Sequence, residues 1–495
     1  MSRQIVIHID LTYKNELSLI IRNPYDSVVI LGEGVSTMGD GFKLTRRQVL
    51  QAGAFAGMGA LLWGAAGCSR PASKPEQSAT LGSAEAYKGT LNLYGWSAVV
   101  ETIQKRVDAF TAAKKLPVSY TNTAWAQYHD AAVTKFTGNA PMDVVYCSDA
   151  WVSEWAEAGW IVPIDGFPGV DDLKKDLVES AVSGATYKGK YYGLPYYADY
   201  MAFLYNAEHL EKAGIKAPPA TWDEVVQQAK QIKAAGVAEY PMLLALAQET
   251  WLTEYICAMT YSRGGSLFSQ ENDALFDQAG GPAEAALQWM VDAVHTHKVT
   301  NPAAVETGEL AALKAMQAGQ ASFILLGRYR LSSLNDPKQS QIAGKARQAM
   351  MPSGMSGKGE TVLWSRPYVI SAQAAKDKDR LAAAWELMKW LGGKDDQGRF
   401  ETQKQVLLAS GSSFATKPLF ADPDVQAYYK SWGDPDLMQR QMDLARTKEG
   451  MLPFFPEWDT FNKTAWSNAV LKRSTPAEAL AASAAKWRDL KKSWK

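Results

Sequence analysis

Aromatic side chains stand beside carboxylates and guanidinium groups at several predicted strand ends and loops. The chain contains 17 Trp, 21 Tyr and 15 Phe, so Trp outnumbers Phe. An aromatic plane packs against the apolar C–H face of a pyranose ring with little loss of entropy, and planar polar groups bind the ring's hydroxyls. This mixture predicts a binding site for a sugar-like solute. Its candidate residues are Trp96, Trp125, Tyr128, Asp149, Trp151, Tyr197, Asp199, Trp251, Arg328, Tyr329, Trp364, Arg366, Glu457 and Trp458.

Other tryptophans lie in segments where apolar residues recur with helical spacing. A tryptophan in such a stripe packs in the core more often than it binds a ligand. The tryptophans that we expect in the core are Trp155, Trp160, Trp222, Trp289, Trp385 and Trp390.

Length and composition limit the fold and the partners. The chain has 495 residues, of which 47% are hydrophobic and 21% are charged, as in ordinary globular proteins. This length suggests two lobes or domains rather than one simple core. The 52 basic residues balance 52 acidic ones, and we find no basic stripe of the kind that nucleic-acid binding needs. We therefore do not expect nucleic acid as a partner.

Strands and helices alternate in the segment that contains the first candidate residues. The expected strands cover 90–96, 116–123 and 143–149, and the expected helices cover 99–114, 128–139 and 151–160. This alternation is typical of a doubly wound α/β lobe, in which a sheet is flanked by helices and ligands sit beyond the carboxyl ends of the strands. Trp96, Trp125 and Asp149 each fall just after such a strand or in a loop.

The segment 38–67 has the features of an export signal. Arg46 and Arg47 precede Val49–Ala66, an uncharged stretch rich in Ala and Gly. The paired arginines resemble a twin-arginine signal, and the residues before Cys68 resemble a lipobox, in which the cysteine is lipidated. The alternative is a small-residue transmembrane anchor. Either reading places the rest of the chain outside the cytoplasm, tethered to a membrane through the polar linker 68–87.

The stretch before this signal is unusual, because residues 1–37 add sequence that no export signal needs. Met38 begins an ordinary n-region, so we expect translation to start there and residues 1–37 to be a misannotated extension. A genuinely extended n-region is the alternative.

Cysteine and histidine spacing gives no support for a metal, redox or cofactor site. With Cys68 assigned to lipid, Cys147 and Cys257 either pair or remain buried thiols, and neither belongs to a CxxC motif. His295 and His297 form an isolated HxH, and two residues apart on a helix do not share a face. The segment 354–360 lacks the spacing of a phosphate loop. We expect no cofactor and no metal.

Four blocks of sequence resemble the family 1 extracellular solute-binding proteins, the maltose-binding-protein-like receptors of ABC importers. The strongest is Tyr192–Lys233, which contains Gly193-Leu194-Pro195-Tyr196, Leu204-Tyr205-Asn206 and Pro218-Pro219-Ala220-Thr221-Trp222-Asp223-Glu224. Three further blocks agree in order: Met142–Asp165, Ala312–Leu331 and Leu381–Phe400. The resemblance covers the chain from about Thr90 to the C-terminus.

The resemblance implies a two-lobed periplasmic-binding-protein fold, an α/β architecture in which hinge segments join the lobes. We expect lobe I to comprise 88–197 plus 363–415, and lobe II to comprise 198–362 plus 416–495. Two lobes on several hinge strands can close over a ligand. Within the strongest block, Thr221 and Glu224 have the spacing of a capping box at the start of a helix.

The resemblance also ranks the candidate residues. Tyr329 and Trp458 are the favoured stacking platforms, followed by Asp149 or Trp151 and then Trp251. Tyr329 follows the apolar strand ASFILL, and we expect Trp458 in a loop after Phe455 and Pro456. Asp149 and Arg366 are the expected hydroxyl partners.

The resulting hypothesis is a lipid-anchored, extracytoplasmic receptor that captures a sugar or oligosaccharide and delivers it to ABC permease subunits served by a separate ATPase. We expect a monomer. The alternatives are a receptor for a polyol, glycerol phosphate or polyamine, a purely structural surface module, and a secreted glycan-active enzyme. The last would need a carboxylate pair, for which Asp149 and Glu457 are the conceivable members.

Overall fold

The computed structural model describes residues 6–11, 17–22, 80–355 and 357–494. The chain divides into two compact units, Met1–Gly67 and Cys68–Lys495. In the first unit, β1 (Val6–Leu11) pairs with β2 (Leu17–Arg22) as an antiparallel hairpin. Arg46, Arg47, Cys68 and the first part of the linker lie outside the described residues, so the export and lipidation hypotheses stay predictions.

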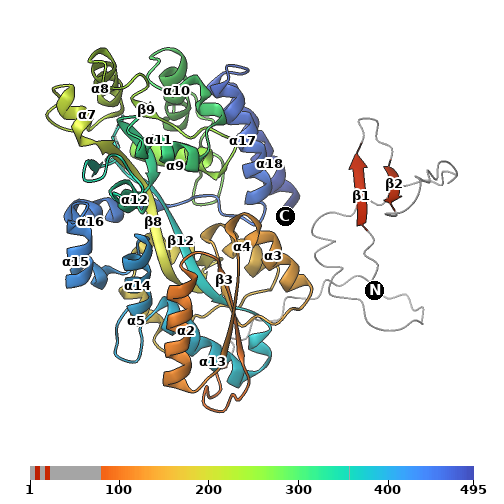
Figure 1. The fold of residues 1–495 in the computed structure, drawn as a ribbon. Helices are drawn as coiled ribbons and strands as arrows, with labels where there is room; N and C mark the ends of the chain where they lie inside the picture. The colour runs from red at the N-terminus through yellow and green to blue at the C-terminus, as the bar shows by residue number, and fades with distance from the viewer. Residues whose placement is uncertain (1–5, 12–16, 23–79, 356, 495) are drawn as a thin grey trace, which may run out of the picture. The chain divides into compact units, whose positions relative to one another are not determined.

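A nine-stranded sheet organises the second unit (Figure 1). Its strands run in the order β4-β3-β5-β12-β8-β10-β9, with β11 paired to β8 and β13 paired to β12. Their bounds are β3 Leu91–Trp96, β4 Val118–Thr123, β5 Val144–Tyr146, β8 Gly193–Asn206, β9 Met242–Leu243, β10 Phe323–Gly327, β11 Ala346–Ala349, β12 Thr361–Ile370 and β13 Ala445–Thr447.

The first half of the sheet, β3 to β5, is parallel and is flanked by helices, as the sequence predicts. The inner strands β3 and β5 are largely buried, as expected of parallel strands covered by helices, whereas the edge strand β4 has no buried residue. The helices around it are α2 (Val100–Lys114), α3 (Trp125–Thr137), α4 (Asp149–Glu157), α13 (Lys378–Gly392) and α14 (Glu401–Ser410). The predicted order of strand and helix is confirmed throughout this region.

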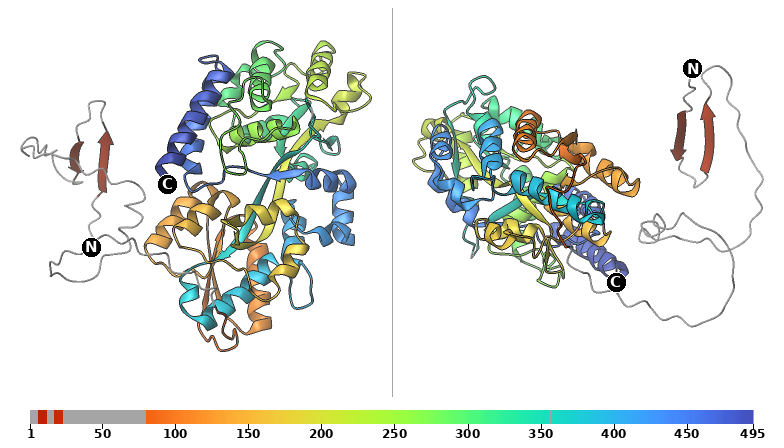
Figure 2. Two further views of the ribbon diagram at one scale, coloured as in Figure 1. Left: turned by 180° about the vertical axis from the view of Figure 1, so that it is seen from behind. Right: turned by 90° about the horizontal axis from the view of Figure 1, so that it is seen from below.

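The second half of the sheet, β9 to β11, is flanked by another set of helices. These are α7 (Ala207–Lys212), α8 (Trp222–Ala234), α9 (Thr250–Ser262), α10 (Pro282–His295), α11 (Glu309–Gln317), α17 (Phe455–Val470) and α18 (Pro476–Trp494). The C-terminal helices α17 and α18, dark blue in Figure 2, pack on each other and on α10. The predicted N-cap is confirmed, since Thr221 Oγ1 accepts from the Glu224 N–H. The Glu224 carboxylate differs from the standard capping box, because it accepts from the N–H of Ala220, one residue before the N-cap.

Two long strands in the middle of the sheet join its halves. β8 is 14 residues long and pairs antiparallel with β12 through its first part and with β10 and β11 through its second. The predicted crossing segment is therefore confirmed as one extended strand. After α14 the chain forms η3 (Lys417–Ala421), α15 (Pro423–Lys430) and α16 (Pro435–Asp443) before β13 returns to β12. The exact lobe boundaries stay a prediction.

The remaining elements are short. They are α5 (Val170–Lys175), α6 (Glu179–Gly184), β6 (Thr186–Tyr187), β7 (Lys190–Tyr191), η1 (Pro302–Glu306), α12 (Arg330–Leu334) and η2 (Ala374–Lys376). None of the described helices is long and apolar enough to cross a membrane.

The tryptophans predicted as core residues mostly lie in the core. Trp155, Trp222, Trp289, Trp385 and Trp390 are buried, and the half-buried Trp160 stacks on Phe136. The two described cysteines, Cys147 and Cys257, are both free and buried, and burial raises the pKa of each thiol. The thiols are therefore protonated at neutral pH.

Candidate functional site

Three indoles form a cluster where β3, α3 and α4 meet. Trp96 ends β3, Trp125 begins α3, and Trp151 lies in the first turn of α4. The Trp125 and Trp151 rings stack with centroids 5.1 Å apart, and Trp96 lies 5.6 Å from Trp125. Trp125 is 39% exposed, so its indole is accessible at the surface of this cluster.

An ion pair lies next to the indoles. Asp149 begins α4, and its Oδ1 accepts a hydrogen bond of 3.0 Å from Arg366 of β12, while its Oδ2 accepts from the Ser365 N–H at 2.8 Å. The Arg366 guanidinium carbon lies 5.1 Å from the centroid of the Trp125 ring. The carboxylate therefore fixes a cation against an exposed aromatic face, an arrangement that leaves guanidinium N–H groups beside a stacking surface.

A second aromatic group is built around β8 and β12, the two strands that carry Tyr197 and Arg366. Tyr197 of β8 is the cross-strand partner of Arg366, and its hydroxyl accepts a hydrogen bond of 3.1 Å from Trp364 Nε1. The ring of Trp251, in the first turn of α9, meets the Trp364 ring edge-on at 5.7 Å. Tyr197 and Trp364 are buried, whereas Trp251 is half-buried. The central strands thus bring helices from both halves of the sheet to one place.

Tyr329 joins this second group through the end of β10. It follows Gly327 and Arg328, as the sequence predicts, and it is half-buried. A Cβ at Gly327 would stand 2.3 Å from the Tyr329 ring and 3.2 Å from Trp364, so both rings pack over this glycine. Only glycine permits this approach, because a side chain there would displace one ring or the other.

A buried ion pair that the sequence analysis missed lies beside these residues. Glu254 follows Trp251 by one turn of α9, and its Oε1 lies 2.9 Å from Lys448 Nζ. Asp149 and Arg366 both act electrostatically on Glu254 and Lys448, which places the two ion pairs within one electrostatic neighbourhood. Burial lowers the pKa of Lys448, but the carboxylates of Glu254 and Asp149 together outweigh it, so the pKa of Lys448 is raised.

Several polar atoms in this neighbourhood have no hydrogen-bond partner. They include the hydroxyl of Tyr146, Oε2 of Glu254 and Oγ of Ser365, all buried. A buried polar atom without a partner costs free energy unless a ligand satisfies it. Tyr146 meets Trp96 and Trp125 with its ring, so these atoms border both the indole cluster and the ion pairs. Hydroxyl groups of a solute can both donate and accept hydrogen bonds, so they are suited to all three of these polar atoms.

The structure contradicts the predicted position of Trp458. This residue does not lie in a loop but in α17, where it is fully buried, and its Nε1 donates to the Ser483 carbonyl at 3.0 Å. Its ring packs against other aromatic rings: Phe268, Phe276, Phe455, Trp466 and Trp487. The prediction of a stacking platform at Trp458 is therefore wrong, because the indole belongs to the core.

Asp199 and Arg328 also have a structural role. They form a bidentate ion pair with both contacts at 3.1 Å, and their side chains are 0% and 1% exposed. Arg328 also donates to the Gly411 carbonyl, and Asp199 accepts from the Ser413 N–H. The pair ties β8 to the segment after α14, which leaves neither side chain accessible to a ligand.

Two further candidates lie away from the exposed surface of the cluster. Tyr128 is fully buried in α3, where its hydroxyl donates to the Tyr146 carbonyl at 2.8 Å. Glu457 lies on α17 rather than in a loop and pairs with Lys486 at 2.9 Å on the surface. Glu457 and Asp149 thus have different cationic partners on different elements. Among the described residues, no group of three or more His, Cys, Asp or Glu side chains could hold a metal ion.

The two half-sheets, each flanked by helices and joined by the long strands β8 and β12, define a two-part α/β protein with the candidate site beside the shared strands. The chain belongs to the bacterial extracellular solute-binding protein family, which matches residues 96–398.

Two bacterial proteins of similar sequence illustrate the relationship. A binding protein of Brucella abortus is 26% identical over 286 residues, which are 57% of this chain and 66% of that protein. The mannitol-binding protein of Pseudomonas aeruginosa is 26% identical over 235 residues, which are 47% of this chain and 52% of that protein. The match therefore spans about two thirds of the length of the Brucella protein and about half of the length of the Pseudomonas protein.

Solved structures share the fold. The maltose-bound MalE3 of T. maritima superimposes with a TM-score of 0.69 at 22% identity, covering 81% of this chain and 99% of that one. A solute-binding protein of Agrobacterium vitis with bound D-mannitol gives a TM-score of 0.64 at 23% identity, covering 82% of this chain and 99% of that one. These similarities establish a two-lobed binding-protein fold for residues of the second unit.

Proposed function

We propose that this protein is the receptor of an ABC importer for a neutral polyhydroxylated solute, either a sugar or a polyol. The observation that carries the proposal is the exposed Trp125 indole, stacked on Trp151 and bordered by the Asp149–Arg366 ion pair. The indole face suits the C–H face of a sugar, and the fixed polar groups suit its hydroxyls.

The charges beside the indoles favour a neutral solute over the charged alternatives. Asp149 and Glu254 supply two negative charges, and Arg366 and Lys448 supply two positive ones. A polyamine would need an excess of carboxylates, and glycerol phosphate would need an excess of cations. Relatives named for mannitol and maltose agree with this choice.

A panel of solutes tests the proposal by thermal unfolding of the protein. The panel contains maltose, mannitol and ribitol as neutral members, with glycerol 3-phosphate and spermidine as charged ones. A solute at 100 times its Kd adds about 2.7 kcal/mol to the free energy of unfolding, which raises Tm measurably. Stabilisation by the charged members alone would refute the assignment of a neutral solute.

We also infer that the protein binds its solute without changing it. The two carboxylates required by a glycan-active enzyme would be Asp149 and Glu457, yet each pairs with its own cation on a separate element. Solute recovered after long incubation should be chemically intact. Turnover that exceeds background and is lost in Asp149→Asn would assign the protein to the enzymes.

The proposal includes export and membrane anchoring, with the permease and a separate ATPase as partners and a monomeric receptor. Arg46 and Arg47 would direct export, and Cys68 would carry the lipid. Cys68→Ser should abolish membrane attachment, and lysines at both arginine positions should leave precursor in the cytoplasm. Normal anchoring of either variant would refute this part of the proposal.

A further inference from the structure

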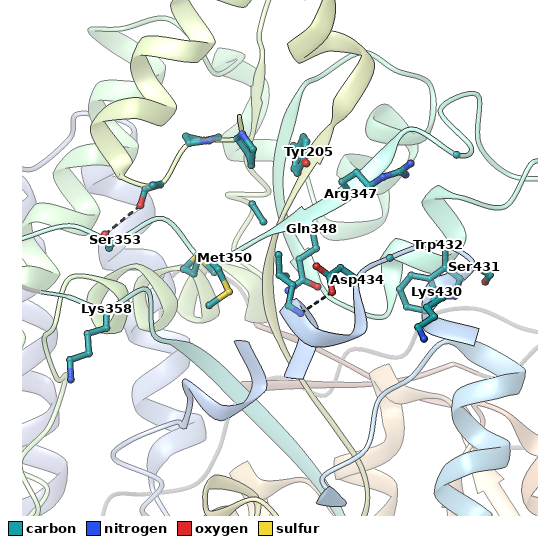
Figure 3. A pocket seen from close by; sticks show the side chains of 18 residues that line it. Tyr205, Arg347, Gln348, Met350, Ser353, Lys358, Lys430, Ser431, Trp432 and Asp434 are labelled. Carbon is teal, nitrogen blue, oxygen red and sulfur yellow. Dashed lines mark hydrogen bonds between the residues drawn. The ribbon is translucent and has the colours of Figure 1, made fainter. Parts of the chain in front are cut away.

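A cavity of about 660 Å³ lies on a different part of the second unit from the indole cluster (Figure 3). Its wall is made by residues 218–220 before α8, by β11 and the residues after it, and by the turn 430–434 between α15 and α16. None of the indoles or ion pairs of the candidate site lines it. Its volume is within the range of about 300–1,000 Å³ that small-molecule sites occupy.

The charged side chains of this cavity are mostly cationic. Arg347, Lys358 and Lys430 line it together with a single carboxylate, Asp434. Within the described residues none of the three cations forms a salt bridge, although Arg347 Nη1 donates to the Ala346 carbonyl at 2.8 Å. Oδ1 of Asp434 accepts from the N–H groups of Asp436 and Leu437 at the start of α16. The cavity therefore holds a surplus of two positive charges.

One wall of the cavity supplies an apolar surface. Trp432 is 9% exposed, and its ring is fixed against Tyr428 and Tyr429. Met350 and Met351 add adaptable apolar surface to the same cavity. This wall therefore offers apolar contacts to the body of a ligand.

The labelled side chains divide between two sides of the cavity. In Figure 3, Arg347, Lys430 and Trp432 lie on one side of Gln348, and Lys358 and Met350 lie on the other. Cations and apolar surface thus occur together in the cavity, and one oxygen of Asp434, Oδ1, is used by its own helix.

We propose that this cavity is a second binding site, separate from the indole cluster, for a small organic anion with an apolar body. A carboxylate, phosphate or sulfonate group would be attracted by the exposed cations that line the cavity, Arg347, Lys358 and Lys430, and the apolar body would pack on Trp432 and the methionines. A charge-assisted hydrogen bond from one of these cations would supply the selectivity for an anion.

The dye 1-anilinonaphthalene-8-sulfonate tests the proposal, because it joins an anionic group to an aromatic body and fluoresces in apolar surroundings. We expect saturable binding to the intact chain at a single site. Loss of charge-assisted hydrogen bonds in the double variant Arg347→Gln, Lys430→Gln should weaken binding at least about tenfold. N-phenyl-1-naphthylamine, the neutral analogue, should bind at least about tenfold more weakly than the dye itself.

Arg440→Gln is the matched control, because Arg440 is an exposed arginine of α16 that does not line the cavity. This variant should bind the dye as the parent protein does. Thermal unfolding confirms that every variant is folded, as expected for exposed residues. Equal affinity of the double variant and the parent, equal affinity of the neutral analogue, or no saturable binding at about 1 mM dye would each overturn the proposal.

Discussion

Trp125 and Trp458 are both indoles from the candidate set, but their environments differ. Trp125 is 39% exposed, whereas Trp458 is fully buried. If Trp125 is a stacking platform, Trp125→Ala should weaken solute binding by about ten- to a thousandfold, as at other aromatic hot spots, and leave Tm of the unliganded protein nearly unchanged. Isothermal titration and thermal unfolding measure the two effects separately.

Trp458→Ala is the matched comparison within the same chain. Truncation of this core indole should lower the free energy of unfolding by about 3–5 kcal/mol, because it removes buried contacts and leaves a cavity. Any folded fraction should still bind solute. If instead Trp458→Ala loses solute binding at unchanged stability, the assignment of Trp458 to the core would be wrong.

His129 gives the indole cluster a pH-sensitive neighbour. Its Nε2 lies 2.7 Å from Glu154 and its Nδ1 3.3 Å from Asp130, and its ring meets Trp151. Burial lowers the pKa of His129, but the hydrogen bond and charge of Glu154, with a further contribution from Asp130, outweigh it and raise the pKa above 6.5. The stability that protonated His129 contributes is therefore fully present below its pKa in the unfolded chain, and it is lost as pH rises through its pKa in the folded protein.

His129→Gln should accordingly destabilise the protein more at about pH 5.5 than at about pH 9, by roughly 1 kcal/mol for a partly buried, charge-assisted hydrogen bond. Urea unfolding at both values checks this. His209 should show the opposite pH dependence of stability. Burial lowers the pKa of His209, so the stability that its neutral form contributes is lost as pH falls. A pH-independent effect of His129→Gln would show that the ion pair contributes nothing.

Single residues were predictable where a local pattern exists. Asp149 and Tyr329 follow apolar strands, and a strand end identifies such positions. The prediction for Trp458 was wrong because Pro456 was assigned to a loop, although proline in the first turn is a helix-start signal. Glu254 and Lys448 are 194 positions apart, so only the folded chain brings them together.

Among the elements, β8 depends on a buried charge pair. Asp199 and Arg328 are almost completely inaccessible, so Asp199→Asn leaves a guanidinium with no opposite charge in the interior. We expect this variant to lose about 3–5 kcal/mol of unfolding free energy. The double variant Asp199→Leu, Arg328→Met should be more stable than Asp199→Asn, because no charge remains buried. Chemical denaturation measures the free energy of unfolding of both variants. A lower value for the double variant than for Asp199→Asn would contradict the proposed cost of an unpaired buried charge.

Helices and strands were predictable where the signal is local, and not where they depend on pairing with distant segments. The α/β alternation from β3 to α4 and the N-cap of α8 rest on local apolar periodicity and cap residues, which the sequence displays directly. The continuity of β8 through two half-sheets depends on pairing with strands far along the chain. The parallel return of β13 to β12 likewise joins residues more than eighty positions apart, and no local signal marks it.

At the scale of the whole molecule, we expect solute to make the second unit more compact. Residues from α4, α9 and the central strands converge on the candidate site, so a solute that contacts both halves favours the closed arrangement. Small-angle scattering should show a smaller radius of gyration with saturating solute. Trp125→Ala at the same solute concentration is the control and should remain at the unliganded value. An unchanged radius in the parent protein would contradict closure.

The pairing of β8 along nearly its whole length has a consequence for amide hydrogen exchange. Gly193–Tyr200 bond to β12 and Met201–Asn206 bond to β10 and β11, with one irregularity between Arg366 and Pro367. A movement that bends these strands keeps their hydrogen bonds, so the amides of β8 should exchange slowly with or without solute. Deuterium uptake should instead fall in the first turns of α3 and α9, where Trp125 and Trp251 stand. The joint between the halves would then be among the slowest-exchanging parts of the molecule, although it is where the motion occurs.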